Sequence, residues 1–152
     1  SIMKDLPDVI EGEFDTPVDK ANVLSQMLNN MEETLSPRFC IDVRKYIKTL
    51  NVEDEANDEA LEHLHDFIDE SVSLDEYCNK YGKLLKFDPV ERTEKWECVI
   101  YDVERKCAEL LEDEQRGMGF CFAYWSAKRA VLQKYGITWR SPAVMNPRVL
   151  FD

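Results

Sequence analysis

Apolar residues recur every three or four positions along most of the chain, and this period constrains the fold more than any other feature of the sequence. Six consecutive stretches carry such a stripe, and proline and capping residues that begin helices lie between them. The alternation typical of a β-strand is confined to a weak stretch at residues 137–139. The sequence therefore predicts an all-α protein, a bundle of five or six helices.

Start signals place these helices along the chain. Ser73 with Glu76 has the spacing of a capping box, in which the serine accepts from the backbone of the third helical residue. Asp88 followed by Pro89 is the strongest signal, because a capping residue, a first-turn proline and an acidic first turn coincide. The predicted helices cover about residues 16–35, 37–50, 55–70, 73–85, 89–115 and 119–135.

The two ends of the chain lack the helical period. We expect residues 1–15 to form an irregular lead-in. Residues 137–152, interrupted by Pro142 and Pro147, are expected to form an irregular tail that docks on the bundle through its apolar side chains. Gly136 suits a left-handed helix cap just before this tail. Because no linker or repeat interrupts the chain, the sequence predicts one helical domain over residues 1–152.

The cysteine pattern and the hydropathy of the sequence indicate the cellular compartment to expect. The five cysteines are odd in number, widely spaced and form no C-x-x-C pair, so we expect reduced thiols, most of them in the core. No apolar run approaches the ~20 residues that cross a bilayer, and the first residues lack the pattern of a signal peptide. We therefore expect a cytoplasmic protein that does not bind membranes.

Acidic residues are concentrated in one part of the sequence. No lysine or arginine lies between Lys48 and Lys80, whereas residues 53–76 hold eleven acids. Like charges this close repel one another, and a purely structural helix gains nothing from them. The simpler interpretation is a solvated helix face, and the functional one is a surface that docks a basic partner. The candidate partner-binding residues are Glu53, Asp54, Glu55, Asp58, Glu59, Glu62, Asp66, Asp69 and Glu70.

This charge pattern leads to a hypothesis about function. We expect a non-enzymatic acidic interaction module, such as an adaptor, an inhibitor or an immunity-type protein, that binds another protein with a basic surface. We expect no cofactor, and the net charge of −12 argues against nucleic acid as a partner. A related hypothesis is that the acidic surface imitates the phosphates of DNA and inhibits a DNA-binding enzyme.

Clustered glutamates support an alternative, a metal-dependent all-α hydrolase of nucleotides or phosphate esters. All-α nucleotide pyrophosphatases hold magnesium with Glu-x-x-Glu on one helix and Glu-x-x-Asp on another. The pairs Glu59 with Glu62 and Glu94 with Glu97 are similar to the first half of that pattern, and these four residues are the metal ligands of this hypothesis. The second half is missing, because residues 109–112 repeat Glu-x-x-Glu without the aspartate.

The remaining motifs of known sites are incomplete. Glu62 and His65 have the Glu-x-x-His spacing of a di-iron ligand pair, but a second such pair needs a histidine beyond His63 and His65, and the chain has none. The sequence also contains no Gly-x-Ser-x-Gly and no phosphate-binding glycine motif. No catalytic residue is predicted.

The last 36 residues differ from the rest in charge and in aromatic content. They hold five basic residues and one acid, a net charge of +4, against fourteen basic and thirty acidic residues before them. They also hold seven of the sixteen aromatic residues. Basic and aromatic residues together can bind single-stranded nucleic acid, but an aromatic stripe at helical spacing is usually core. We expect this segment to close the core, with its cations facing the acidic helices.

Overall fold

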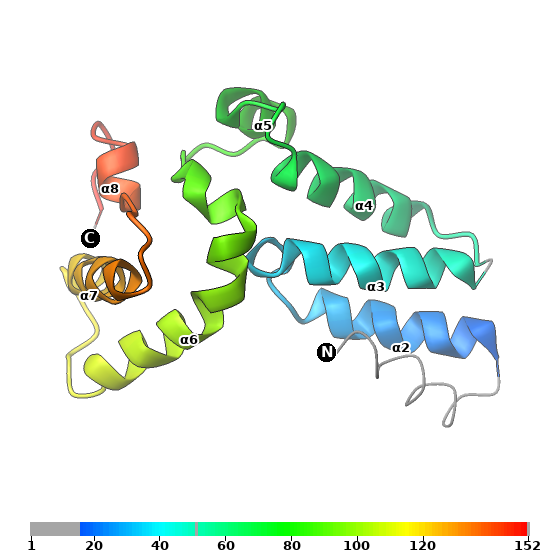
Figure 1. Ribbon diagram of the computed structural model, residues 1–152, viewed down its shortest axis with the longest axis horizontal. Helices are drawn as coiled ribbons and strands as arrows, with labels where there is room; N and C mark the ends of the chain where they lie inside the picture. The colour runs from blue at the N-terminus through cyan, green and yellow to red at the C-terminus, as the bar shows by residue number, and fades with distance from the viewer. Residues whose placement is uncertain (1–15, 51, 152) are drawn as a thin grey trace. The chain divides into compact units, whose positions relative to one another are not determined.

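The computed structural model describes residues 16–50 and 52–151. These residues form seven α-helices and two short 3-10 helices and contain no strand, which confirms the all-α prediction (Figure 1). They fall into two compact units, the first ending at Val72 and the second beginning at Ser73. The expected lead-in, residues 1–15, lies outside the described residues, and the single domain stays a prediction.

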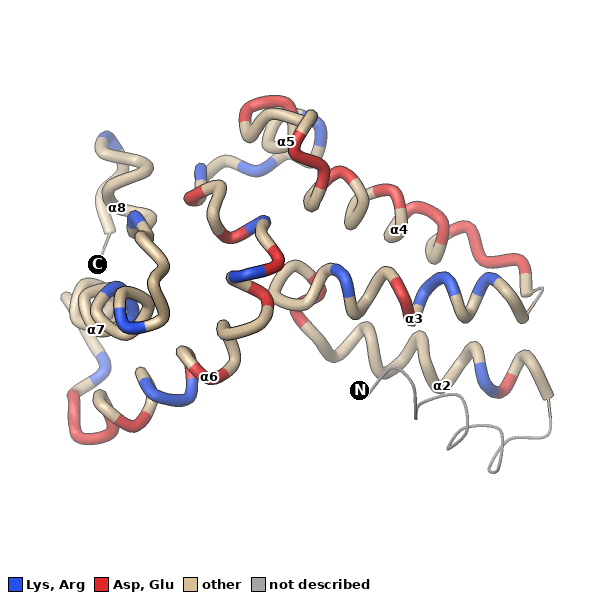
Figure 2. The backbone as a smooth tube through the Cα atoms, viewed as in Figure 1, with Lys and Arg blue, Asp and Glu red and all other residues tan. Residues whose placement is uncertain are grey.

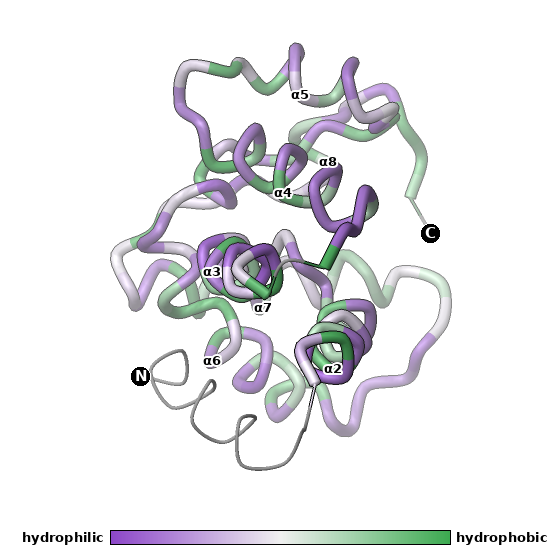
Figure 3. Tube along the Cα trace, turned by 90° about the vertical axis from the view of Figure 1, so that its right-hand side faces the viewer, coloured by the Kyte–Doolittle hydropathy of each residue, from purple (hydrophilic) through white to green (hydrophobic). Residues whose placement is uncertain are grey.

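Three helices and a 3-10 turn build the first unit. They are α2 (Pro17–Asn29), η1 (Glu33–Leu35), α3 (Pro37–Thr49) and α4 (Glu55–Ile68). Helix α3 packs against both α2 and α4 (Figure 1). Hydrophobic and hydrophilic positions alternate around α2 and α4, as expected for helices that bury one face (Figure 3). The core of this unit consists of Ala21, Leu24, Leu28, Cys40, Ile41, Val43, Ile47, Leu61 and Leu64.

The first predicted helix, residues 16–35, ends early. Thr16 caps its start as predicted, because its hydroxyl accepts from the backbone N–H of Asp19 at 3.1 Å. The helix stops at Asn29, where two consecutive asparagines favour turns over helix. A separate 3-10 turn then begins at Glu33, and the Glu33 side chain binds Arg44, as described below.

The second unit holds the remaining helices. They are α5 (Leu74–Lys80), η2 (Pro89–Arg92), α6 (Glu94–Leu110), α7 (Phe120–Lys134) and α8 (Pro142–Met145). Helix α6 packs against η2 and α7. The buried apolar side chains of this unit are Tyr77, Cys78, Trp96, Ile100, Val103, Cys107, Val131, Leu132, Ile137 and Trp139.

The longest helix starts later and ends earlier than the predicted 89–115. Asp88 caps only the 3-10 turn η2, accepting from the N–H of Val90 at 3.0 Å. Thr93 is extended and accepts from the N–H of Trp96 at 3.2 Å, so α6 begins at Glu94. The helix C-terminus carries a partial negative charge, which repels nearby carboxylates. The acids at 109 and 112–114 therefore disfavour further helix, and α6 ends at Leu110.

Gly136 ends α7 as predicted. Its φ is +77°, its N–H donates to Gln133 and the N–H of Ile137 donates to Leu132, both at 3.0 Å. The tail that follows is only partly packed, because Ile137 is buried whereas Leu150 is 97% exposed. It also contains α8, an additional short helix that raises the number of α-helices above the predicted five or six.

Candidate functional site

The predicted partner-binding residues lie along α4 and at its two ends (Figure 2). The opposite side of α4 is buried through Leu61, Leu64 and Phe67, so the charged side is turned away from the core. Asp54 and Asp66 are half-buried, and the other seven acids are exposed. We call these nine residues the acidic face: Glu53, Asp54, Glu55, Asp58, Glu59, Glu62, Asp66, Asp69 and Glu70.

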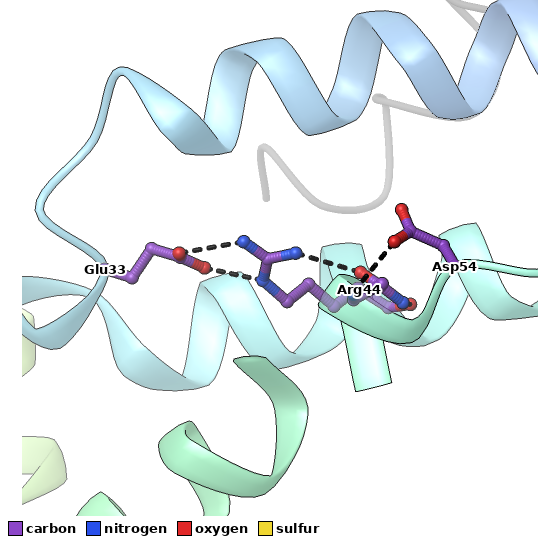
Figure 4. Close-up of polar contacts among 4 residues, drawn as sticks. Glu33, Arg44 and Asp54 are labelled. Carbon is purple, nitrogen blue, oxygen red and sulfur yellow. Dashed lines mark hydrogen bonds and ion pairs between the residues drawn. The ribbon is translucent and has the colours of Figure 1, made fainter. Parts of the chain in front are cut away.

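A buried polar network fixes the start of the acidic face on α3 (Figure 4). Arg44, which is buried, donates from Nη1 to Asn57 Oδ1 at 3.0 Å, and Asn57 Nδ2 donates to the Arg44 carbonyl at 3.1 Å. The guanidinium also donates from Nε and Nη2 to the two carboxylate oxygens of Glu33, at 2.7 and 2.8 Å. Asp54 caps α4 by accepting from the N–H of Asn57 at 3.1 Å. The beginning of α4 is therefore held by interactions of defined geometry.

A recess opens at this end of the acidic face. It has a volume of about 320 Å³ and is lined by Lys48, Val52, Glu53, Asp54, Asn57 and Asp58. Three carboxylates against one ammonium make the recess negative. Lys48 Nζ lies 3.5 Å from Asp58 Oδ1, and both side chains are more than half exposed. An ion pair this exposed contributes only ~0–1 kcal/mol, so a cation from a partner can replace Lys48 at little cost.

The acidic face is not uniform along α4. The recess brings Glu53, Asp54 and Asp58 together, whereas Asp69 and Glu70 follow the other end of the helix. Asp69 forms local hydrogen bonds there: its Oδ1 accepts from the N–H and from the hydroxyl of Ser71, at 2.9 and 2.7 Å. The recess is therefore the part of the acidic face that groups several carboxylates around one space.

The structure places the metal ligands of the alternative hypothesis in both units. Glu59 and Glu62 lie on α4, and Glu94 and Glu97 lie at the start of α6. Among residues 16–50 and 52–151, no three or more histidine, cysteine, aspartate or glutamate side chains are grouped so that they could hold a metal ion. The metal site stays a prediction.

A cleft in the second unit was not predicted. It lies between α7 and residues 138–144 and has a volume of about 320 Å³. None of the carboxylates in residues 16–50 and 52–151 lines it, in a chain with 31 acids. We call it the arginine cleft; its lining residues are Phe122, Trp125, Ser126, Arg129, Thr138, Trp139, Arg140, Ser141 and Val144.

The sequence contains a signal for one wall of this cleft only. Residues 122, 125, 126 and 129 are three and four positions apart, so they share one face of α7. That face holds two aromatic rings, a hydroxyl and a guanidinium. The other wall is formed by the tail after the left-handed turn at Gly136, and the period of α7 contains no information about it.

Asp88 orients Arg140 in the second wall. Asp88 Oδ2 accepts from the backbone N–H of Arg140 at 2.8 Å and from its Nε at 3.1 Å. Burial raises the pKa of Asp88, but the hydrogen bonds from Arg140 and from the Val90 N–H outweigh burial and lower it below its ordinary value. The buried carboxylate is therefore ionised at neutral pH and holds the arginine in place.

Trp139, also in the second wall, is held by polar groups. Its Nε1 donates to Glu91 Oε2 at 3.0 Å. Burial raises the pKa of Glu91, and the Trp139 hydrogen bond and the charge of Lys128 offset this only in part. Lys128 Nζ lies 4.9, 5.3 and 5.8 Å from the ring centres of Trp139, Trp96 and Tyr124. The same ammonium forms an ion pair with Glu104 at 3.1 Å, which holds it beside these rings.

Comparisons with known proteins do not show a family. No protein-family model, curated protein or solved structure matches the chain. No helix in the described part of the chain is both long and apolar enough to span a membrane. A functional assignment therefore depends on the chemistry of the acidic face and the arginine cleft.

Proposed function

We propose that this protein is a non-enzymatic binding module whose acidic face docks another protein with a basic surface. The observation that carries the proposal is the recess at the start of α4. Glu53, Asp54 and Asp58 line a space of about 320 Å³, and a lysine or arginine side chain of the partner would enter it. Lys48 places an ammonium 3.5 Å from Asp58, and this ion pair supports a basic side chain as the group that would enter the recess.

The charge distribution supports a partner in addition to a structural role. Residues 53–70 hold nine acids and supply no lysine or arginine of their own. Exposed like charges at this density repel one another and cost stability. A basic partner would relieve that repulsion on binding, and the field of the acidic face would speed the encounter between the two proteins.

The anchoring of α4 supports binding as well. Since Arg44 and Asn57 fix the first turn of the helix, the recess does not have to be ordered when the partner arrives. A site that is already ordered loses less conformational entropy on association, and more of the interaction energy appears as affinity.

The test compares two pairs of substitutions that remove the same charge. Glu53→Gln with Asp58→Asn neutralises the recess, and Glu112→Gln with Asp113→Asn neutralises two exposed acids that follow α6. The probe is a fluorescent lysine- and arginine-rich peptide, and the measurement is its dissociation constant by fluorescence anisotropy. With about 1 kcal/mol from each ion pair, the recess variant should bind roughly tenfold or more weakly, and the control within about twofold of wild type.

Ionic strength provides a second readout of the same complex. Affinity should fall steeply as salt is raised, because the charges involved are exposed and screened. Equal losses in the recess variant and the control would mean that only net charge matters, and they would overturn the recess as the site. Binding that did not depend on salt would overturn the electrostatic part of the proposal.

A further inference from the structure

We propose that the arginine cleft binds a small anion in which a planar ring is joined to a phosphate, the chemical class of a nucleotide. The cleft belongs entirely to the second unit and shares no residue with the acidic face. The proposal therefore does not depend on the function proposed above.

Two arginines and two hydroxyls make the cleft suitable for a phosphate. Arg129 is exposed, and its side chain makes no hydrogen bond or ion pair within the residues that the structure describes. Arg140 is bound to Asp88 through Nε, which leaves its two Nη groups for a ligand. Ser126 and Thr138 add hydroxyl donors. Guanidinium groups pair with phosphate oxygens through parallel hydrogen bonds, and this geometry gives specificity in addition to charge.

The two cations are not equivalent. Asp88 offsets part of the charge of Arg140 and, in exchange, fixes the position of its guanidinium. Arg129 has no such carboxylate partner in the part of the chain that the structure describes, so its charge remains for a ligand. We therefore expect Arg129 to supply most of the attraction for the anion, and Arg140 to orient it.

Aromatic side chains suit the planar part of the ligand. Phe122 is 47% exposed and meets Trp125 edge to face, with ring centres 5.5 Å apart. Trp125 also meets Phe151 edge to face, with ring centres 5.1 Å apart. Nucleobases stack on such rings, and a volume of about 320 Å³ is at the lower end for small-molecule sites. A mononucleotide fits this chemistry better than a dinucleotide cofactor.

Charge elsewhere in the chain favours a free nucleotide over a nucleic acid strand. The chain carries −12 overall, which repels a long polyanion. A single phosphate in the cleft would interact mainly with Arg129, Arg140 and the Asp88 carboxylate that binds Arg140. Charges farther away are screened over about 8 Å at physiological ionic strength. The experiment therefore compares a free nucleotide with a nucleic acid strand.

In the experiment, the full chain is titrated separately with AMP, adenosine, inorganic phosphate and an eight-nucleotide single-stranded oligonucleotide. Binding is measured by tryptophan fluorescence and by amide chemical shifts. AMP should perturb signals of residues 122–144 and bind at least about tenfold more tightly than adenosine or phosphate alone, because each of these lacks one half of the recognised group. The oligonucleotide should bind no more tightly than AMP.

Three variants assign the interaction to the cleft. Arg129→Gln should weaken AMP binding about tenfold. Lys134→Gln, the same charge change at an exposed position of α7 outside the cleft, should leave it within about twofold. Phe122→Ala should weaken AMP and adenosine but not phosphate. Unchanged helical circular dichroism confirms that each variant is folded.

Three results would overturn the proposal. The first is the absence of any spectral change at millimolar AMP. The second is an equal effect of Arg129→Gln and Lys134→Gln, which would reduce the interaction to net charge. The third is tighter binding of the oligonucleotide than of AMP, which would make the cleft part of a nucleic-acid surface instead of a nucleotide site.

Discussion

Arg44 and Asn57 bind each other twice. The guanidinium donates to the amide oxygen of Asn57 at 3.0 Å, and the amide nitrogen of Asn57 donates to the main-chain carbonyl of Arg44 at 3.1 Å. Both residues are buried, and they are 13 positions apart, on α3 and α4. The pair therefore sets which side of α4 faces the core and, as a consequence, which side presents the acids.

Asn57→Ala should destabilise the protein by about 1–3 kcal/mol, because it leaves Arg44 Nη1 and the Arg44 carbonyl buried without these partners. The free energy of unfolding from urea denaturation measures this loss. Asp58→Ala, at the next and exposed position, should change it by no more than about 0.5 kcal/mol. Similar losses in the two variants would contradict a structural role for the pair.

Glu91→Gln should stabilise the protein increasingly as the pH rises from about 4 to neutral. Burial raises the pKa of Glu91 above its ordinary value of 4.5, so folding favours the protonated carboxyl. The stability that Glu91 provides is thus complete below the unfolded-state pKa and is lost as the pH rises through the folded-state pKa. Glutamine never ionises and still offers Trp139 an acceptor.

The measurement is the difference in unfolding free energy between Glu91→Gln and wild type at a series of pH values. The difference should grow in favour of the variant across this range and then level off. A difference that is constant, or that shrinks as the pH rises, would contradict the raised pKa of Glu91.

Gly136→Ala should cost about 1–2 kcal/mol, because the φ of +77° is unfavourable for a residue with a Cβ. The new Cβ would also lie 3.3 Å from Lys95 Nζ, which donates to the Gly136 carbonyl at 3.0 Å. Gly117→Ala is the control, since a Cβ there meets nothing within 4 Å and φ lies outside the left-handed region. Thermal unfolding should show a lower midpoint for Gly136→Ala only.

Lys128→Met should destabilise the second unit by about 2 kcal/mol. Methionine keeps the apolar stem but removes an ammonium that lies near three rings and pairs with Glu104. Lys106→Met is the comparison, because Lys106 is exposed and, among the described residues, makes polar contacts with Tyr135 alone: its Nζ lies 4.7 Å from the ring centre and donates to the hydroxyl at 2.7 Å. It should cost about 0.5 kcal/mol in the same denaturation experiment, and equal costs would contradict the role of the aromatic group.

Helix starts were predictable where one capping residue decides them. Ser73 accepts from the N–H of Glu76 at 3.1 Å and begins α5 as expected, and α4 agrees with the predicted 55–70 within two residues. The prediction was wrong at Asp88, where a second cap follows five residues later at Thr93. Because the Asp88 carboxylate also binds Arg140, a residue from the tail, the local pattern could not show which cap begins the long helix.

The candidate sites were predictable only where they follow one element. The acidic face follows α4, and its position on an exposed side agrees with the charge pattern. The arginine cleft needs a tail segment beside α7, and the interaction that positions it joins residues 52 apart. Neither a helical period nor a motif encodes a contact over that distance, so only the folded chain reveals this site.

The division into two compact units has a consequence for optical spectroscopy. All three tryptophans, Trp96, Trp125 and Trp139, belong to the second unit. Indole emission during denaturation therefore reports that unit alone, whereas far-ultraviolet circular dichroism reports the helices of both. Superimposable curves would show that the two halves melt cooperatively, and displaced curves would assign a separate midpoint to each, in one unlabelled sample.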